Sequence, residues 1–263
     1  MSQISTAEFA IVTGASTGIG FELAKCCAQH GYDLLVVADE PEITAAAETL
    51  RSCGTVVHAL QADLATPEGI HSLLKATGGR RVDALLANAG RGLGQGFLDQ
   101  SFPDILHVLN TNVTGTLMLV HEVGRAMRTH GGGKILITGS IAGLIPGAYQ
   151  AVYNGTKALL DSFCYALREE LKDTGITVTC LMPGATETEF FERAELMDTK
   201  EGVSKKQPSA EVAKAGFEAM LAGEAGLVTG FSNKLLAAFS HLIPDTALAE
   251  TSAKLNAPGS AGN

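Results

Sequence analysis

The sequence EFAIVTGASTGIG, residues 8–20, decides the fold of this chain. A short apolar run over 8–13 stops at Gly14, and apolar residues with helical spacing follow over 18–30. Glycines at such a turn let the backbone approach a ligand closely, and the following helix presents free N–H groups and a positive dipole end to an anion. A strand, a glycine turn and a helix in this order predict a phosphate-binding loop, although a turn without a ligand can carry the same glycines.

Strand and helix patterns alternate along the rest of the chain. Continuous apolar runs predict buried strands at 8–13, 33–38, 55–60, 82–87, 134–138, 176–182 and 225–229. Helical spacing is found at 18–30, 43–53, 67–77, 103–129, 152–173 and 209–222. This alternation predicts an α/β Rossmann fold, a doubly wound parallel sheet of about seven strands with helices on both faces.

The length and composition fit one domain with a large core. The chain has 263 residues, of which 46% are hydrophobic and 18% charged, and single α/β domains reach about 250 residues. We expect one domain over 1–250. The polar stretch 187–208 breaks the alternation and is expected to be a substrate lid. The small, polar residues 251–263 are expected to form a flexible tail.

The charge and the cysteines limit the partners and the compartment. A net charge of −9 disfavours binding to nucleic acid or to an anionic membrane. The chain has neither an N-terminal signal pattern nor an apolar run of about 20 residues, so neither secretion nor membrane insertion is expected. The five cysteines are irregularly spaced and include no C-x-x-C pair. They are interpreted as reduced thiols of a cytoplasmic protein, with no metal site.

Tyr153 and Lys157 carry the strongest chemical signal in the sequence. They stand four residues apart in a helical stretch, so both side chains are expected on one face. A cation at about 4 Å, with an effective dielectric of about 20, contributes roughly 4 kcal/mol, enough to lower a phenol pKa by nearly 3 units from about 10. Such a tyrosine can exchange a proton near neutral pH. An exposed helix pair with no function is the alternative.

Together these patterns resemble the short-chain dehydrogenase/reductase family over residues 8 to about 230. The loop is spaced G-x-x-x-G-x-G, and an Asn-Ala-Gly element, a serine and Tyr-x-x-x-Lys follow in the family's order. The resemblance implies an NAD- or NADP-dependent oxidoreductase that interconverts an alcohol and an aldehyde or ketone, with Tyr153 as acid/base. The implied catalytic residues are Asn112, Ser140, Tyr153 and Lys157. Asn110 is the competing asparagine, but the Val-x-Gly that follows favours Asn112.

The resemblance also implies a set of cofactor-binding residues. The glycine loop would hold the pyrophosphate, Asp63 the adenine amino group, Lys157 the nicotinamide ribose and Thr188 the carboxamide. The full set is Gly14, Ser16, Thr17, Gly18, Ile19, Gly20, Asp39, Asp63, Leu64, Asn88, Ala89, Gly90, Tyr153, Lys157, Pro183, Gly184, Thr186 and Thr188.

The end of the second strand bears on the choice between NAD and NADP. An acid such as Asp39 can accept hydrogen bonds from the ribose hydroxyls of NAD, whereas NADP places a 2′-phosphate there. No Lys or Arg lies in this segment, Val-Ala-Asp-Glu-Pro over 37–41. Asp39 falls one place later than the family's usual NAD-selecting acid, where Ala38 stands, and a solvated turn is the alternative. NAD is the favoured cofactor and NADP the second choice.

Other functions remain open at this point. A 3-oxoacyl-[acyl-carrier-protein] reductase would need a basic dock for its acidic carrier, and the segment 171–175 holds one Lys offset by an Asp. A non-catalytic cofactor-binding Rossmann protein is another class, but Tyr153 and Lys157 are both intact. A sugar-nucleotide epimerase would space its glycines differently. A small carbonyl or alcohol substrate is expected. The resemblance further implies a homo-oligomer, a tetramer or dimer, through the helices at 103–129 and 152–173.

Overall fold

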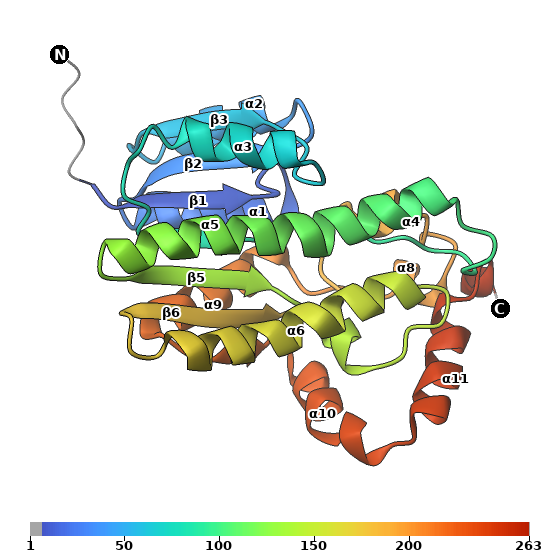
Figure 1. The fold of residues 1–263 in the computed structure, drawn as a ribbon. Coiled ribbons are helices and arrows are strands. Elements are labelled where there is room, and N and C mark those ends of the chain that lie inside the picture. Colours follow the sequence, from blue (N-terminus) through green and yellow to red (C-terminus); the bar gives the residue numbers. More distant parts are fainter. Residues whose placement is uncertain (1–6, 263) are drawn as a thin grey trace.

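The seven expected strands form one parallel sheet in a computed structural model that describes residues 7–262 (Figure 1). The strands are β1 Phe9–Thr13, β2 Asp33–Ala38, β3 Val57–Gln61, β4 Ala84–Ala87, β5 Gly133–Thr138, β6 Ile176–Met182 and β7 Gly226–Val228. Their order is β3-β2-β1-β4-β5-β6-β7, and all six pairings are parallel. The predicted fold class is confirmed. The strand order reverses between β1 and β4, which places a ligand crevice at the carboxyl ends of these strands.

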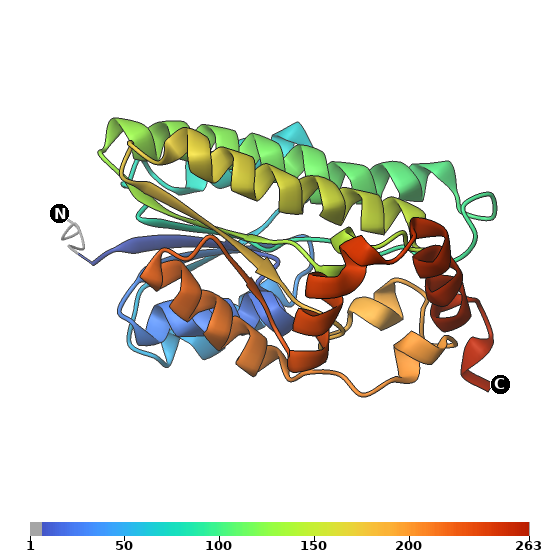
Figure 2. The ribbon, with the colours of Figure 1, turned by 90° about the horizontal axis from the view of Figure 1, so that it is seen from below.

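Helices cover both faces of the sheet, and each face has its own core (Figure 2). One core joins alternate strand residues to α1 Gly18–Gln29, α2 Ile43–Arg51 and α9 Ser209–Ala222. The other joins the remaining strand residues to α3 Pro67–Ala76, α5 Thr116–Thr129 and α6 Ala151–Leu171. In β1, for example, Val12 faces the first core and Ile11 the second. A strand buried on both sides must be apolar at every position, which is why continuous runs identified the inner strands. The edge strand β3 differs from the buried strand expected at 55–60, because only Val57 of its residues is fully buried.

The long helix expected over 103–129 is divided in the structure. It consists of α4 Phe102–Leu109, a π-helical turn over Asn110–Gly115, and α5. Gly115 lies so close to the backbone carbonyl of Leu64 that a Cβ atom would overlap it. π-helical turns inside α-helices are frequent at functional sites, and this one carries Asn112, which is fully buried.

The segment expected to be a lid contains two short helices, α7 Phe190–Arg193 and α8 Lys200–Val203. A backbone bridge between Thr186 and Gln207 closes the segment at its base. Whether it opens and closes as a lid stays a prediction.

The C-terminal segment differs from the expected flexible tail. After α10 Phe231–Phe239, helix α11 runs over Asp245–Asn256, and a short turn follows at Ser260–Gly262. The hydroxyl of Ser260 accepts the N–H of Lys200 at 3.0 Å, and the N–H of Gly259 donates to the carboxylate of Asp198 at 2.7 Å. The tail therefore docks on the lid segment through polar contacts that hydrophobic periodicity does not reveal.

Two expectations concern residues that the structure does not describe. The expectation of no signal pattern concerns a stretch that includes residues 1–6, and these lie outside the described residues. Asn263 of the expected tail lies outside them as well. Within residues 7–262, no helix is long and apolar enough to cross a membrane.

Candidate active site

One cavity of about 520 Å³ lies at the carboxyl ends of the strands, beside β1 and β4. All residues assigned to the cofactor from the sequence line it, and three of the four assigned catalytic residues do so too. Those three are Ser140, Tyr153 and Lys157. Residues that sequence reasoning did not assign also form the wall, among them Glu40, Arg91, Phe190, Arg193, Glu201 and Asn256.

The glycine loop is built for close backbone contact. Gly14 and Gly18 have φ of +63° and +57°, a region that other residues rarely adopt. A Cβ on Gly20 would overlap the carbonyl oxygen of Gly14, and one on Gly18 would lie 2.7 Å from the methyl group of Thr188. The loop therefore leaves a cradle that side chains would fill, at the N-terminus of α1, where a pyrophosphate is stabilised. The residues present fit a dinucleotide.

Asn88 ties the strand ends together beneath the cavity. Its side-chain amide donates to the carbonyl oxygen of Thr13 at 3.2 Å, and its Oδ1 accepts the hydroxyl of Thr138 at 3.0 Å. The hydroxyl oxygen of Thr13 in turn accepts the backbone N–H groups of Asn88 and Ala89, both at 3.0 Å. β1, β4 and β5 are thereby held in one frame.

The first turns of α6 bring Tyr153 and Lys157 to the cavity beside Ser140. The ammonium of Lys157 donates to the carbonyl oxygen of Thr138 at 2.7 Å and lies 5.8 Å from the centre of the Tyr153 ring. The phenol of Tyr153 shares a hydrogen bond with Ser140. The expected common face is therefore present.

The pKa of Tyr153 shifts in the opposite direction from that expected. Burial raises it above the ordinary value, and the hydrogen bond with Ser140 only partly offsets this effect. Burial also lowers the pKa of Lys157. In this state the phenol keeps its proton.

Asn112 does not line the cavity, unlike the other three assigned catalytic residues. Its Oδ1 accepts the backbone N–H of Arg91 at 2.7 Å, and its amide donates to the Arg91 carbonyl at 2.9 Å and to the Thr156 hydroxyl at 3.0 Å. Asn112 therefore braces the loop after β4 against α6.

Asp161 is a buried residue beside the site that sequence reasoning did not predict. It stands one turn after Lys157 on α6, and its Oδ1 accepts the N–H of Ser140 at 3.3 Å and the thiol of Cys180 at 3.4 Å. A Cβ on either Gly139 or Gly143 would overlap its carboxylate, so the turn that carries Ser140 wraps around it. Burial raises the pKa of Asp161 to about 6, against the opposing effect of Lys157.

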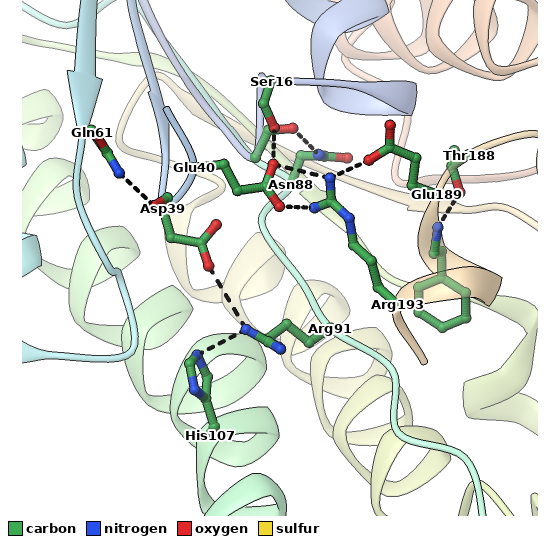
Figure 3. Close-up of polar contacts among 12 residues, drawn as sticks. Ser16, Asp39, Glu40, Gln61, Asn88, Arg91, His107, Thr188, Glu189 and Arg193 are labelled. Atoms are coloured by element: carbon green, nitrogen blue, oxygen red, sulfur yellow. Dashed lines mark hydrogen bonds and ion pairs between the residues drawn. The ribbon is translucent and has the colours of Figure 1, made fainter. Parts of the chain in front are cut away.

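Two arginines from distant segments meet the acids at the end of β2 (Figure 3). Arg193 of α7 pairs with Glu40 and Glu189, and Glu40 also accepts the hydroxyl of Ser16 at 3.0 Å. On the other side, Arg91 lies 3.8 Å from the carboxylate of Asp39. The segment 37–41 itself holds no cation, so neither pair could be predicted from the local sequence.

Phe190 of α7 lies in the cavity wall beside Tyr153. Its ring centre lies 5.0 Å from that of Tyr153 and 5.4 Å from that of Phe191. The lid segment therefore supplies an apolar wall beside the phenol.

Comparison with known proteins places the chain in a family. Residues 8–198 match the short chain dehydrogenase family. The chain belongs to this family. It is 29% identical to an uncharacterized oxidoreductase of Staphylococcus epidermidis, over 73% of this chain and 83% of the relative. It is 31% identical to a 3-oxoacyl-[acyl-carrier-protein] reductase of Synechocystis, over 71% of this chain and 77% of the relative.

The fold matches solved family members as well. A short-chain dehydrogenase from Sphingobium yanoikuyae in complex with NADPH superposes with a TM-score of 0.80 at 29% identity, covering 89% of this chain and 94% of that one. As a member of the family, the protein is an NAD(P)-dependent oxidoreductase.

The glycine cradle generates a first prediction. Gly20→Ala forces the Gly14 carbonyl to move, so NAD(P)H affinity should fall about 30-fold or more, which corresponds to roughly 2 kcal/mol. Fluorescence titration measures the Kd. Gly155→Ala is the control, because no atom lies within 4 Å of its Cβ and the helix α6 favours alanine. An unchanged Kd for Gly20→Ala would contradict the cradle.

The buried carboxylate generates a second prediction. A folded-state pKa of about 6 exceeds the unfolded value of about 3.9, so the ionised form destabilises the fold, and stability is lost as pH rises through 6. Asp161→Asn removes this loss. The free energy of unfolding of the variant minus that of wild type should therefore be about 1 kcal/mol larger at pH 8 than at pH 5.

Chemical denaturation at the two pH values measures this difference. Glu169→Gln on the exposed side of α6 is the control and should give a difference that does not vary between pH 5 and pH 8. An Asp161→Asn effect that is equally independent of pH would contradict the buried titration.

Proposed function

We propose that the chain interconverts an alcohol and an aldehyde or ketone, with Tyr153 as acid/base. One observation carries the proposal: Tyr153, Ser140 and Lys157 line the same cavity as the glycine cradle. Bound NAD(P) would supply or accept the hydride. A substrate carbonyl placed between the cradle and α6 lies within reach of a phenol that holds its proton.

The three side chains divide the chemistry between them. Tyr153 gives its proton to the substrate oxygen during reduction and removes one during oxidation. The Ser140 hydroxyl, already bonded to the phenol, stabilises charge that develops on the same oxygen. Lys157 is held by the Thr138 carbonyl, from where it can bind a ribose hydroxyl and oppose the rise in the tyrosine pKa.

The acyl-carrier-protein reductase remains the second candidate function. The Synechocystis relative that bears this name shares 31% identity with the chain. The acidic surface speaks against it, because a carrier protein is itself acidic. Lys172, just after the catalytic helix, is paired with Glu169 rather than free to dock a partner. A small soluble carbonyl compound is the better substrate.

Assembly and location are part of the proposal. Exposed apolar residues on the outer faces of α4 and α6 support a homo-oligomer, a dimer or tetramer; they include Phe102, Leu106, Leu109 and Leu159. Five free cysteines support a reducing compartment such as the cytoplasm.

The catalytic assignment predicts the effect of removing one hydroxyl. Tyr153→Phe should lower kcat about 100-fold or more, the scale of general acid catalysis, with NAD(P)H affinity nearly unchanged. Steady-state kinetics on a panel of carbonyl compounds measures the loss. Tyr165→Phe, at an exposed position of the same helix, is the matched control and should keep wild-type activity. A Tyr153→Phe variant with half its activity would rule out the assignment.

NAD is proposed as the preferred cofactor. Asp39 and Glu40 both line the ribose end of the cavity, and a 2′-phosphate would have to displace Glu40 from Ser16 and Arg193. Arg91 and Arg193 weaken the repulsion, and the Sphingobium relative was solved with NADPH. The ion pairs occupy both arginines, however, so NADP gains a cation only by breaking a pair.

The acids and arginines at this end of the cavity predict how cofactor preference changes when one of their charges is altered. Wild type should have the higher kcat/KM with NADH. Asp39→Arg should move the preference toward NADPH by about tenfold or more, the equivalent of 1.4 kcal/mol. Glu40→Gln should move it the same way, because a negative charge is removed and Arg193 keeps only Glu189 as a charged partner, and adding Arg193→Ala should reduce that shift. A tenfold wild-type preference for NADPH would overturn the choice of NAD and leave the reaction intact.

A further inference from the structure

A polar cluster lies in the wall of the cavity, away from the glycine loop. It consists of Glu201 from α8 and of Ser252 and Asn256 from α11. Ser252 and Asn256 are only 3% and 4% exposed. Helices α8 and α11 pack on each other, so the lid segment and the C-terminal helix build this wall jointly.

The cluster offers acceptors in excess of donors. The amide of Asn256 donates to the Ser252 hydroxyl at 3.3 Å and shares a hydrogen bond with the Glu201 carboxylate. The Asn256 carbonyl oxygen is buried and accepts no hydrogen bond from any residue in 7–262. Burial raises the pKa of Glu201, while Asn256 and Lys206 oppose the rise. Glu201 therefore lines the cavity beside an amide oxygen that has unused acceptor capacity.

A buried hydrogen-bond acceptor that has no donor in the described part of the chain, such as the Asn256 oxygen, is energetically unfavourable. A buried polar atom without a partner costs about 1–3 kcal/mol. The Asn256 oxygen is closed off from water, so its need is met only by a donor that reaches it. Around the Glu201 carboxylate, a ligand that displaces water without replacing its hydrogen bonds loses affinity. A substrate that fills this end with a hydrocarbon group is therefore penalised, whereas one that brings a donor is favoured.

The cluster is close enough to the reaction centre to act on a small substrate. Glu201 lies within electrostatic reach of Tyr153, whose pKa it helps to raise. Phe190 lies beside the phenol and Phe191 also lines the cavity. Tyr153, an apolar wall and a set of acceptors therefore line the same cavity.

We propose that the substrate is a carbonyl compound that carries a hydrogen-bond donor, a hydroxyl or an ammonium group, away from its carbonyl carbon. The donor binds Glu201 and the carbonyl oxygen of Asn256 while the substrate oxygen meets Tyr153. This inference rests on the proposed function and deepens it by naming a substrate class. It also separates that class from the plain acyl chain of a fatty-acid intermediate, which brings no donor to this wall.

Matched ketones test the proposal. Cyclohexanones with a methyl, hydroxyl or amino group at carbon 3 or 4, and butanone and pentanone with and without a terminal hydroxyl, are compared by kcat/KM. A site built to bind a substrate donor rejects the analogue that lacks it, so the best hydroxyl or amino member should exceed its methyl or hydrogen partner by at least about 30-fold. The amino and hydroxyl arms identify which donor is used.

Variants locate the preference in the cluster. Glu201→Gln keeps the size but removes the charge, so an ammonium preference should fall more than a hydroxyl preference. Asn256→Leu removes the unmet acceptor and should bring the ratio within about threefold of unity. Glu192→Gln, an exposed lid position that does not line the cavity, is the control and should keep the wild-type ratio.

The outcomes separate this inference from the proposed function. If wild type turns over matched ketones equally and Tyr153→Phe is inactive, the donor proposal is overturned, but the proposed dehydrogenase function is retained. If wild type turns over none of the ketones, the proposed function fails, and thermal-shift binding of the same pairs in the presence of NAD(P) decides the inference alone. Stronger stabilisation by the donor-bearing member, lost in Asn256→Leu, supports the inference. Equal stabilisation overturns it.

Discussion

The side chain of Asn88 fixes the frame on which the whole site depends. The sheet order reverses between β1 and β4, so the chain leaves these neighbouring strands in opposite directions and opens a crevice. Asn88 spans this point by donating to Thr13 and accepting from Thr138. Thr13 leads into the glycine loop, and the carbonyl of Thr138 holds Lys157. The glycine loop and helix α6 are therefore both positioned by the side-chain amide of Asn88, which limits how far they can move apart.

A second constraint couples α6 to the turn that carries Ser140. Asp161 is enclosed by that turn, and only glycine fits at positions 139 and 143 beside its carboxylate. A buried carboxylate whose pKa is raised by burial makes the fold less stable at neutral pH. The same carboxylate accepts the N–H of Ser140 and so orients the hydroxyl that bonds Tyr153. Stability is given up where the proposed chemistry needs alignment, a common feature of active sites.

The sequence predicted the parts of this arrangement that local patterns encode. A strand buried on both faces is a continuous apolar run, the glycine loop is contiguous around Gly20, and Lys157 follows Tyr153 by one helical turn, so each could be found within a short window. Parts that depend on distant segments were not predicted. Arg193 meets its acid 153 residues away, and Asn256 reaches the cavity from a tail whose composition resembles a flexible end. The π-helical turn around Asn112 depends on a close backbone approach that no residue pattern reveals.

Tyr153, Lys157 and Asp161 stand on successive turns of one face of α6, and burial pushes each toward its neutral form. A cation one turn away suggested a lowered tyrosine pKa. Desolvation of the phenol outweighs this cation. The ammonium of Lys157 lies 5.8 Å from the ring centre and is held by the backbone carbonyl of Thr138 rather than by the phenol oxygen. A buried phenol that keeps its proton can give it to a carbonyl oxygen at once, whereas taking a proton from an alcohol requires its pKa to fall first. Under the proposed role of Tyr153, the free site therefore favours reduction, whereas oxidation requires a positive charge in the cavity to lower the tyrosine pKa.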